Sequence, residues 1–221
     1  MNAEPPAIRI ALARRLRSMP AMRNDDDDDI RGTIRSPKLL VPKSDQRAMD
    51  LPTRLYRDRI VWLGSAIDSD VANDVVQQLL CLQLEDAKKP ITLYINSPGG
   101  SIVDGMAIYD TIRRSPCPVH AVVAGMAASM GAVILSGCTK GQRTILPHSE
   151  VLLHQPLGGA RGQATDIEIS AKRILKMKEM LMKLLADNCG KTIEKMTEDC
   201  DRDYWLDADE AVAYGICDRL A

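Results

Sequence analysis

Apolar and polar positions follow two rhythms along residues 50–221, short β-branched runs and longer segments with helical spacing. Val75, Leu79 and Leu82, for example, recur at helical spacing and predict an amphipathic helix over 68–85. The same reasoning predicts strands at 59–63, 91–95, 119–123, 143–146, 151–154 and 204–205, and helices at 102–113, from about 129, 163–188 and 208–214. Such repeated β–α units predict an α/β domain with mostly parallel strands.

Residues 1–49 lack this pattern and differ in charge and proline content. Five Arg and one Glu give residues 1–24 a net charge of +4, and Asp25–Asp29 then add five negative charges. Opposed charge blocks broken by prolines predict a flexible N-terminal tail ahead of the domain at 50–221. An Arg-rich helix over 8–17 leaves an organelle-targeting peptide open as an alternative.

The composition excludes several broad classes of protein. With 45% hydrophobic and 27% charged residues the whole chain is not disordered, and 29 Lys and Arg against 30 Asp and Glu exclude a globally basic nucleic-acid binder. The 18 uncharged residues Ala121–Cys138 reach the lower limit for a membrane helix, but their glycines and early valines favour a buried strand followed by a buried helix. Six cysteines include no CxxC pair and we expect no secretory leader, so we predict reduced thiols and a cytoplasmic protein.

The candidate chemistry begins with Ser129, in a stretch of small residues between a predicted strand and a predicted helix. A hydroxyl at a helix N-terminus lies near free N–H groups and the positive end of the helix dipole. That placement suits a serine that attacks a carbonyl and generates an oxyanion. An ordinary N-cap serine has the same placement without any chemistry, and the local pattern alone does not separate the two.

Two further features lie at predicted strand ends. Of the three histidines, His154 ends a strand just before Gln155 and Pro156, so it is placed at the rim of the sheet as a catalytic base or as a hydrogen-bonded rim residue. The turn Asn96–Gly100 offers backbone N–H groups where ligand sites of α/β sheets gather, although a plain strand-to-helix turn has the same sequence. Together, the N–H groups of Gly100 and Met130 can form a two-donor oxyanion hole.

Several longer motifs then point to a family. They are NSPGG at 96–100, GMAIYDT at 105–111, AASMG at 127–131, HQPLGGARGQATDIEI at 154–169 and DRDY at 201–204. From residue 50 to about 220 the chain resembles the proteolytic subunit of the Clp protease, a self-compartmentalising serine peptidase. The resemblance implies a crotonase-like α/β fold, which is a ββα spiral with a protruding strand–helix handle, here at 155–188.

The resemblance also implies a serine endopeptidase with a Ser-His-Asp triad. Ser129 is the expected nucleophile, His154 the general base and Asp203 the residue that orients the base. The N–H groups of Gly100 and Met130 are the expected oxyanion hole. The implied substrate is an unfolded polypeptide that binds as an added strand between a loop and the handle. Its expected contacts are Gly99, Ser101, Ile102, Leu157 and Gly158.

Assembly and partners are implied in the same way. The family forms two stacked heptameric rings of subunits joined through their handles, with Asp201 and Arg202 at the ring-to-ring contact. A separate AAA+ unfoldase would use ATP, because this chain has no phosphate-binding loop. The subunit itself is expected to use no cofactor or metal and to bind no nucleic acid or membrane. The predicted helix 163–188 agrees with this assembly, since a monomer could not fully bury its apolar face. That face comprises Ile169, Ile174, Met177, Leu181 and Leu184.

The chain also departs from the family pattern. Residues 1–49, with five consecutive Asp, do not match the family's short propeptide and axial-pore loop. The family docks its unfoldase in aromatic pockets, whereas the matching positions here hold Thr92, Arg114 and Thr144, with Tyr94 retained and no Phe anywhere in the chain. In addition, a methionine at position 126 replaces a glutamine that is common in the family.

Two other functions are compatible with parts of the pattern. Another crotonase-fold enzyme, acting on acyl-CoA, also uses backbone oxyanion holes but does not need Ser129, His154 and Asp203 together. A catalytically weak or structural subunit of a mixed Clp ring typically lacks a triad residue, and none is missing here. The complete set of three residues therefore favours an active serine endopeptidase.

Overall fold

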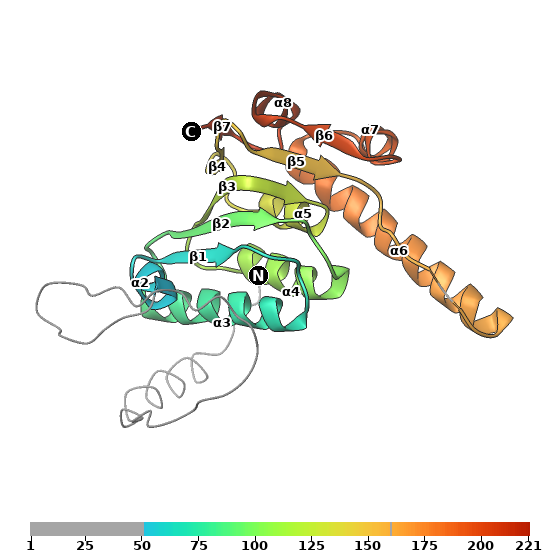
Figure 1. Cartoon of the computed structure of the whole chain (residues 1–221), viewed down its shortest axis with the longest axis horizontal. Coiled ribbons are helices and arrows are strands. Elements are labelled where there is room, and N and C mark those ends of the chain that lie inside the picture. Colours follow the sequence, from blue (N-terminus) through green and yellow to red (C-terminus); the bar gives the residue numbers. More distant parts are fainter. Residues whose placement is uncertain (1–50, 160) are drawn as a thin grey trace, which may run out of the picture. The chain divides into compact units, whose positions relative to one another are not determined.

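The computed structural model describes residues 51–159 and 161–221, so the predicted tail lies outside the described residues and remains a prediction. Within these residues seven strands form one sheet (Figure 1). The strands are β1 (Ile60–Leu63), β2 (Ile91–Ser97), β3 (Val119–Ala128), β4 (Arg143–Ile145), β5 (Glu150–Leu153), β6 (Tyr204–Leu206) and β7 (Arg219–Leu220). The order β1-β2-β3-β4-β7 is parallel throughout, β5 is parallel to β3, and β6 is antiparallel to β5. This confirms the predicted α/β fold with mostly parallel strands.

Helices connect the strands and cover the sheet. Those in the described residues are α2 (Leu51–Arg57), α3 (Ser69–Glu85), α4 (Ile102–Arg113), α5 (Met130–Gly137), α6 (Ala164–Cys189), α7 (Ile193–Asp199) and α8 (Ala208–Tyr214). The helices α3, α4 and α5 pack on one side of the sheet, and the N-terminal half of α6 extends away from the domain (Figure 1). That extended half belongs to the handle that we predict at 155–188.

Helix ends follow local chemical signals in the sequence. Asp68 caps α3 by accepting a hydrogen bond of 2.9 Å from the N–H of Val71. Asp207 and Glu210 form a reciprocal capping box at the start of α8. Gly190 ends α6 with a left-handed φ of 70°, a conformation that glycine adopts without steric cost. These signals explain why the helices predicted at 68–85, 163–188 and 208–214 begin or end within about one residue of their predicted bounds.

The strand β3 is longer than the sequence pattern indicates. We predicted a strand over 119–123, but β3 continues to Ala128 before α5 begins at Met130. The reason is a change of neighbour: β3 pairs with β4 up to Val123 and then with β5 from Met126 to Ala128. The long-range partner β5 keeps the second half of β3 extended in spite of its helix-forming residues.

The uncharged segment 121–138 is therefore a strand followed by a buried helix, and the strand is buried at Ala121, Val123, Ala127 and Ala128. All residues of α5 are buried within the domain. None of the helices in residues 51–159 and 161–221 is both long and apolar enough to cross a membrane. All six cysteines lie in this part of the chain as free thiols, and only Cys81 is exposed. Burial raises the pKa of the Cys138 thiol to about 12, which keeps it protonated and unreactive.

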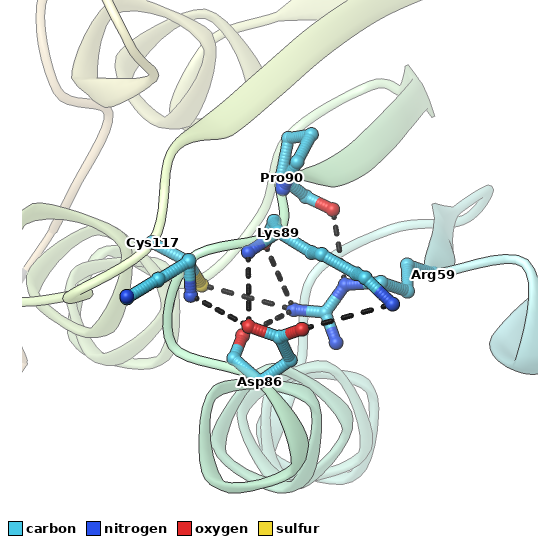
Figure 2. Close-up of polar contacts among 6 residues, drawn as sticks. Arg59, Asp86, Lys89, Pro90 and Cys117 are labelled. Atoms are coloured by element: carbon cyan, nitrogen blue, oxygen red, sulfur yellow. Dashed lines mark hydrogen bonds and ion pairs between the residues drawn. The ribbon is translucent and has the colours of Figure 1, made fainter.

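Arg59, just before β1, ties the beginning of the domain to the connection between α3 and β2 (Figure 2). Its backbone has a φ of 61°, which is uncommon for a residue other than glycine. Its Nη2 donates to the carbonyl oxygens of Asp86 and Lys89, each at 3.1 Å, and its Nε donates to that of Pro90 at 3.0 Å. One guanidinium thus satisfies three carbonyls just beyond the end of α3.

Arg143 on β4 forms a buried ion pair with Asp218 that the sequence pattern does not reveal. The Arg143 side chain is only 2% exposed and that of Asp218 is 15% exposed. Further Arg143 donors reach the carbonyl oxygens of Asn188 at 3.3 Å and Gly215 at 3.0 Å. Burial alone would raise the pKa of Asp218, but the hydrogen bonds from Arg143 outweigh it and hold the pKa below its ordinary value. The pair therefore fastens β4 to the ends of α6 and α8.

We expect Arg143→Leu to destabilise the domain by about 3 kcal/mol, because it leaves the mostly buried carboxylate of Asp218 without its partner. Since the folded-state pKa of Asp218 is depressed, the contribution of the pair is fully present above the unfolded-state pKa of about 3.9 and is lost as the pH falls through the folded-state pKa. Urea unfolding at fixed protein concentration, at neutral pH and below about pH 3, measures both effects. Exposed Arg161→Leu is the control, and equal stability of the two variants at neutral pH would contradict this role for Arg143.

Candidate active site

Ser129 lies at the junction of β3 and α5 in an unusual backbone conformation. Its φ is 54° and its ψ is −120°, a region that costs a residue with a side chain about 1–3 kcal/mol. Its N–H donates to the carbonyl oxygen of Leu152 at 2.9 Å, which continues the pairing of β3 with β5. Ser129 occupies the N-cap position of α5, yet its side chain makes no capping hydrogen bond in the described structure. Capping alone therefore does not account for this serine, and its hydroxyl is available for chemistry.

The turn after β2 lies directly against Ser129. A Cβ atom at Gly99 would lie 2.7 Å from Ser129 Cβ and 2.9 Å from Met130 N, so only a glycine allows this approach. Two backbone hydrogen bonds of 2.8 Å with Ile67, to the carbonyl of Gly99 and from the N–H of Ser101, hold the turn in place. The sequence pattern placed this turn at a strand end, and its glycines make the close contact possible.

The backbone N–H groups of Gly100 and Met130 are both free to bind an anion. Neither N–H has a hydrogen-bond partner within the described residues. Met130 is the first residue of α5, whose N-terminal N–H groups and dipole favour negative charge. Gly100 and Met130 also line the same cavity as Ser129. The arrangement supplies two donors beside one serine hydroxyl, as an oxyanion hole requires.

His154 and Asp203 lie at the open end of the β5–β6 pair. The antiparallel register pairs Leu153 with Tyr204, so its continuation by one residue sets His154 opposite Asp203. Beyond this point the N–H of Gln155 donates to the carbonyl oxygen of Cys200 at 2.7 Å, which keeps the two segments together. Residues 49 positions apart in sequence are thus neighbours because of strand pairing.

Ser129, His154, Gly100 and Met130 line one cavity of about 250 Å³, whereas Asp203 does not line it. No hydrogen bond joins the side chains of Ser129, His154 and Asp203 in the part of the chain that the structure describes. Catalytic hydrogen bonds are often long in unliganded enzymes and tighten when substrate binds, so their absence does not count against these residues.

The other expected substrate contacts divide into two groups. Ile102 and Leu157 line the cavity, and Leu157 is 83% exposed, which leaves it open to a ligand. Gly99, Ser101 and Gly158 do not line it: Ser101 caps α4 by accepting from the N–H of Asp104, and Gly158 lies beside Ile174 of α6. The remaining walls are apolar. They are formed by Pro98, Val133, Leu153, Pro156, Leu181, Met182 and Leu185.

The sequence reasoning did not place any residue of α6 at the candidate site, yet three of them line its cavity. Leu181 belongs to the apolar face that we expect a monomer to bury only in part, and it lies in the buried part, with 4% of its surface exposed. Met182 and Leu185 are buried beside it. The signal that could have identified them is the apolar spacing in the C-terminal half of α6, where the helix returns to the core.

The expected ring-contact residues Asp201 and Arg202 lie in the turn between α7 and β6. Their side chains form an ion pair of 3.8 Å and are 62% and 92% exposed, so the pair adds little to the stability of the monomer. Toward the N-terminal end of α6, Ile167 and Ile169 are exposed by 42% and 61%. Both features leave surface available for another subunit.

Comparison with known proteins assigns these features to a family. The family model described as Clp protease matches residues 43–221. The chain belongs to the Clp protease family. It is also 52% identical over 190 residues to the ATP-dependent Clp protease proteolytic subunit 3 of Synechococcus sp. (strain CC9902), covering 86% of this chain and 95% of that protein. The predicted resemblance, the crotonase-like fold class and the activity of a serine peptidase of the Clp type are thereby confirmed.

The family match begins at residue 43, seven residues before the domain start that we predicted at residue 50. Proteolytic subunits of this family need no cofactor for their own chemistry. Among residues 51–159 and 161–221, no cluster of His, Cys, Asp and Glu is arranged to hold a metal ion.

Proposed function

We propose that this subunit hydrolyses peptide bonds of unfolded polypeptides through an acyl-enzyme formed on Ser129. The observation that carries the proposal is the environment of Ser129. Its backbone is strained, its side chain makes no capping hydrogen bond, and it shares one cavity with His154 and two free N–H groups. Ser129 Oγ attacks the carbonyl carbon while His154 takes its proton, and the N–H groups of Gly100 and Met130 bind the developing oxyanion. His154 then gives the proton to the leaving amine, Asp203 orients the imidazole throughout, and water releases the acyl group by the same steps.

The apolar cavity supports a preference for aliphatic side chains in the bound polypeptide. Its walls are mainly aliphatic side chains and methionine, with Ser129 and His154 at its polar side. An extended substrate along Gly99–Ile102 can place one aliphatic side chain in this cavity, next to the bond that is cut. Cleavage after aliphatic residues is the expected specificity.

A serine-directed fluorophosphonate tests the proposed nucleophile. The folded protein should incorporate one label per subunit, which peptide mass spectrometry should locate on Ser129 and on no other serine. Protein unfolded in urea should not be labelled, because activation requires the folded arrangement. Labelling of Ser65 instead, or no labelling of a protein that hydrolyses acyl-CoA thioesters, would favour another crotonase-fold activity.

The family assembles into oligomeric rings, and we propose two stacked heptameric rings of this chain. The exposed apolar side chains toward the N-terminal end of α6 support contacts between handles, and the exposed Asp201 and Arg202 support a contact close to Asp203. Six free thiols suit a reducing compartment, so we place the assembly in the cytoplasm.

Arg202→Ala should yield smaller particles with weak peptidase activity. The side chain is 92% exposed in the monomer, so its removal should leave the subunit fold intact and act on ring stacking. Analytical ultracentrifugation and hydrolysis of a short fluorogenic peptide measure the two effects together. Arg57→Ala, an exposed arginine on α2, is the matched control. A full-sized and fully active Arg202→Ala particle would show that this residue does not join the rings.

We further propose that a AAA+ unfoldase docks on the open face of the sheet and that this partner, not the subunit itself, uses ATP. A row of side chains crosses this face, because Trp62 pairs with Tyr94, Tyr94 with Val122, Val122 with Thr144, and Thr144 with Arg219. The rings of Trp62 and Tyr94 stack 5.8 Å apart, and Trp62 is 48% exposed. Exposed aromatic pairs are typical of protein interfaces, while Thr144 bound by Arg219 makes the other end of the row polar.

The N-terminal segment is proposed to act on substrate entry rather than on the fold. Removing residues 1–42, which precede the family match, should leave hydrolysis of short peptides unchanged and alter degradation of an unfolded protein. Replacing Asp25–Asp29 by Asn should reproduce the part of this effect that comes from charge. That part should fade with added salt, since exposed charges are screened over about 8 Å at physiological ionic strength. Loss of short-peptide hydrolysis in the truncated protein would make the segment structural.

A further inference from the structure

Gln155, the residue after the proposed base, is bound by two segments that are distant in sequence. Its side-chain Nε2 donates to the carbonyl oxygen of Asp201 at 2.9 Å, and its Oε1 accepts from Lys178 Nζ at 2.8 Å. Its backbone N–H donates to the carbonyl oxygen of Cys200 at 2.7 Å. One residue thus joins the segment after β5, the turn before β6 and the middle of α6.

The chemistry of its partners fixes the orientation of the Gln155 amide. The ammonium of Lys178 can only donate, and the carbonyl oxygen of Asp201 can only accept. The amide oxygen must therefore face Lys178 and the amide nitrogen Asp201, so a flip would lose both hydrogen bonds. A further approach of 3.4 Å between Nε2 and Asp201 Oδ1 favours the same orientation.

Lys178 contributes a positive charge to this hydrogen-bonded connection. It is half-buried on α6, and no salt bridge to it occurs within the described residues. Its hydrogen bond to Gln155 is charge-assisted, and such bonds are about twice as strong as neutral ones. Leu181, Met182 and Leu185, which line the cavity, follow on the same helix within two turns. A shift of α6 would therefore reach the cavity wall and Gln155 together.

We propose that Gln155 is a positioning residue that holds the His154 segment against the Asp203 segment, and that Lys178 couples this alignment to the handle helix α6. The last paired residues of β5 and β6 are Leu153 and Tyr204, and His154 and Asp203 stand just beyond them. The contacts of Gln155 continue the association of the two segments past that point. The inference rests on the proposed triad and adds a residue that touches none of the reacting atoms.

Gln155→Leu removes both side-chain hydrogen bonds and keeps a similar size. We expect kcat for a short fluorogenic peptide to fall at least about tenfold with KM nearly unchanged, because misalignment of the base affects the transition state more than binding. Fluorophosphonate titration should still label every subunit, only more slowly. A merely structural role would instead lower the fraction of subunits that can be labelled.

Two lysine variants test the coupling to α6 and remain informative if Gln155→Leu does not fold. Lys178→Met should lower kcat in the same manner but less, and Lys178→Arg, which keeps a cationic donor, should restore it. The double variant Gln155→Leu/Lys178→Met should be no worse than Gln155→Leu alone, because both act through one link. Gln77→Leu and Lys183→Met, exposed and outside this cluster, are matched controls expected to behave as wild type.

The outcomes separate this inference from the proposed function. If Ser129→Ala is inactive while kcat is unchanged in both Gln155→Leu and Lys178→Met, the triad stands and the positioning role is wrong. Additive losses in the double variant would also overturn the coupling through one link. If Ser129→Ala keeps its activity, the proposed mechanism fails before Gln155 is considered.

Discussion

Ser129→Ala should abolish peptide hydrolysis while the protein still folds and assembles. The substitution removes a single oxygen that makes no capping hydrogen bond, so little packing is lost. In the proposed mechanism, this change leaves His154 without a hydroxyl to activate and the free N–H groups without a covalent intermediate to stabilise. In subtilisin, another serine protease, loss of the triad serine lowers kcat on the order of 10⁶-fold, and a comparable drop is expected here.

Steady-state hydrolysis of a short fluorogenic peptide measures this loss, with particle size followed in parallel. Ser65→Ala is a matched control, since Ser65 is exposed and its hydroxyl, within the described residues, hydrogen-bonds only to the neighbouring carbonyl of Ala66. Substantial activity in cleanly purified Ser129→Ala protein would falsify the assignment of the nucleophile. A variant that fails to assemble would show that the strained turn at Ser129 serves the fold.

Much of the fold could be predicted because its signals are local. The helix at 102–113 begins after a serine cap and ends in basic residues, and α6 ends at the left-handed Gly190. The strand signal in β2 is also local, because buried and less buried residues alternate: Ile91, Leu93 and Ile95 are buried, while Thr92 and Tyr94 face the more open side. Such spacing and caps depend on residues a few positions apart, which a single sequence contains.

The sequence could not reveal features that depend on pairing across the chain. Arg143 and Asp218 are 75 positions apart, and neither lies in a motif that marks it as buried. The extension of β3 to Ala128 depends on β5, which comes more than 20 residues later. Secondary structure is therefore predictable here where the signal is local, and it fails where a distant strand overrides the local preference.

The same distinction between local and long-range signals applies to the candidate site. Its residues Ser129, His154 and Asp203 were identified from their resemblance to family motifs, and local spacing alone left their roles open. The positive φ of Ser129, the approach of Gly99 and the walls from α6 could be seen only in three dimensions. Gln155 lies inside a recognised motif, yet its role depends on Lys178 and Asp201, which the motif does not specify.

Asp203→Asn should lower kcat by about 10⁴-fold at neutral pH, the cost of the same change in the best-studied serine protease triad. The substitution keeps the shape of the side chain but replaces an acceptor by an amide that can present its donor to the imidazole. His154 is then held in the wrong tautomer, or left unoriented, and its cation loses the nearby negative charge. KM should change little, because Asp203 does not line the substrate cavity.

The matched control for this change is Asp209→Asn, an exposed carboxylate in the first turn of α8, which should remain close to wild type. Comparing the two variants separates the loss of a particular carboxylate from the loss of one surface charge. Residual activity in Asp203→Asn should still require Ser129 and should disappear in the double variant with Ser129→Ala. If Asp203→Asn hydrolyses peptides at a wild-type rate, the register between β5 and β6 brings Asp203 opposite His154 for structural reasons only, and another residue must orient the base.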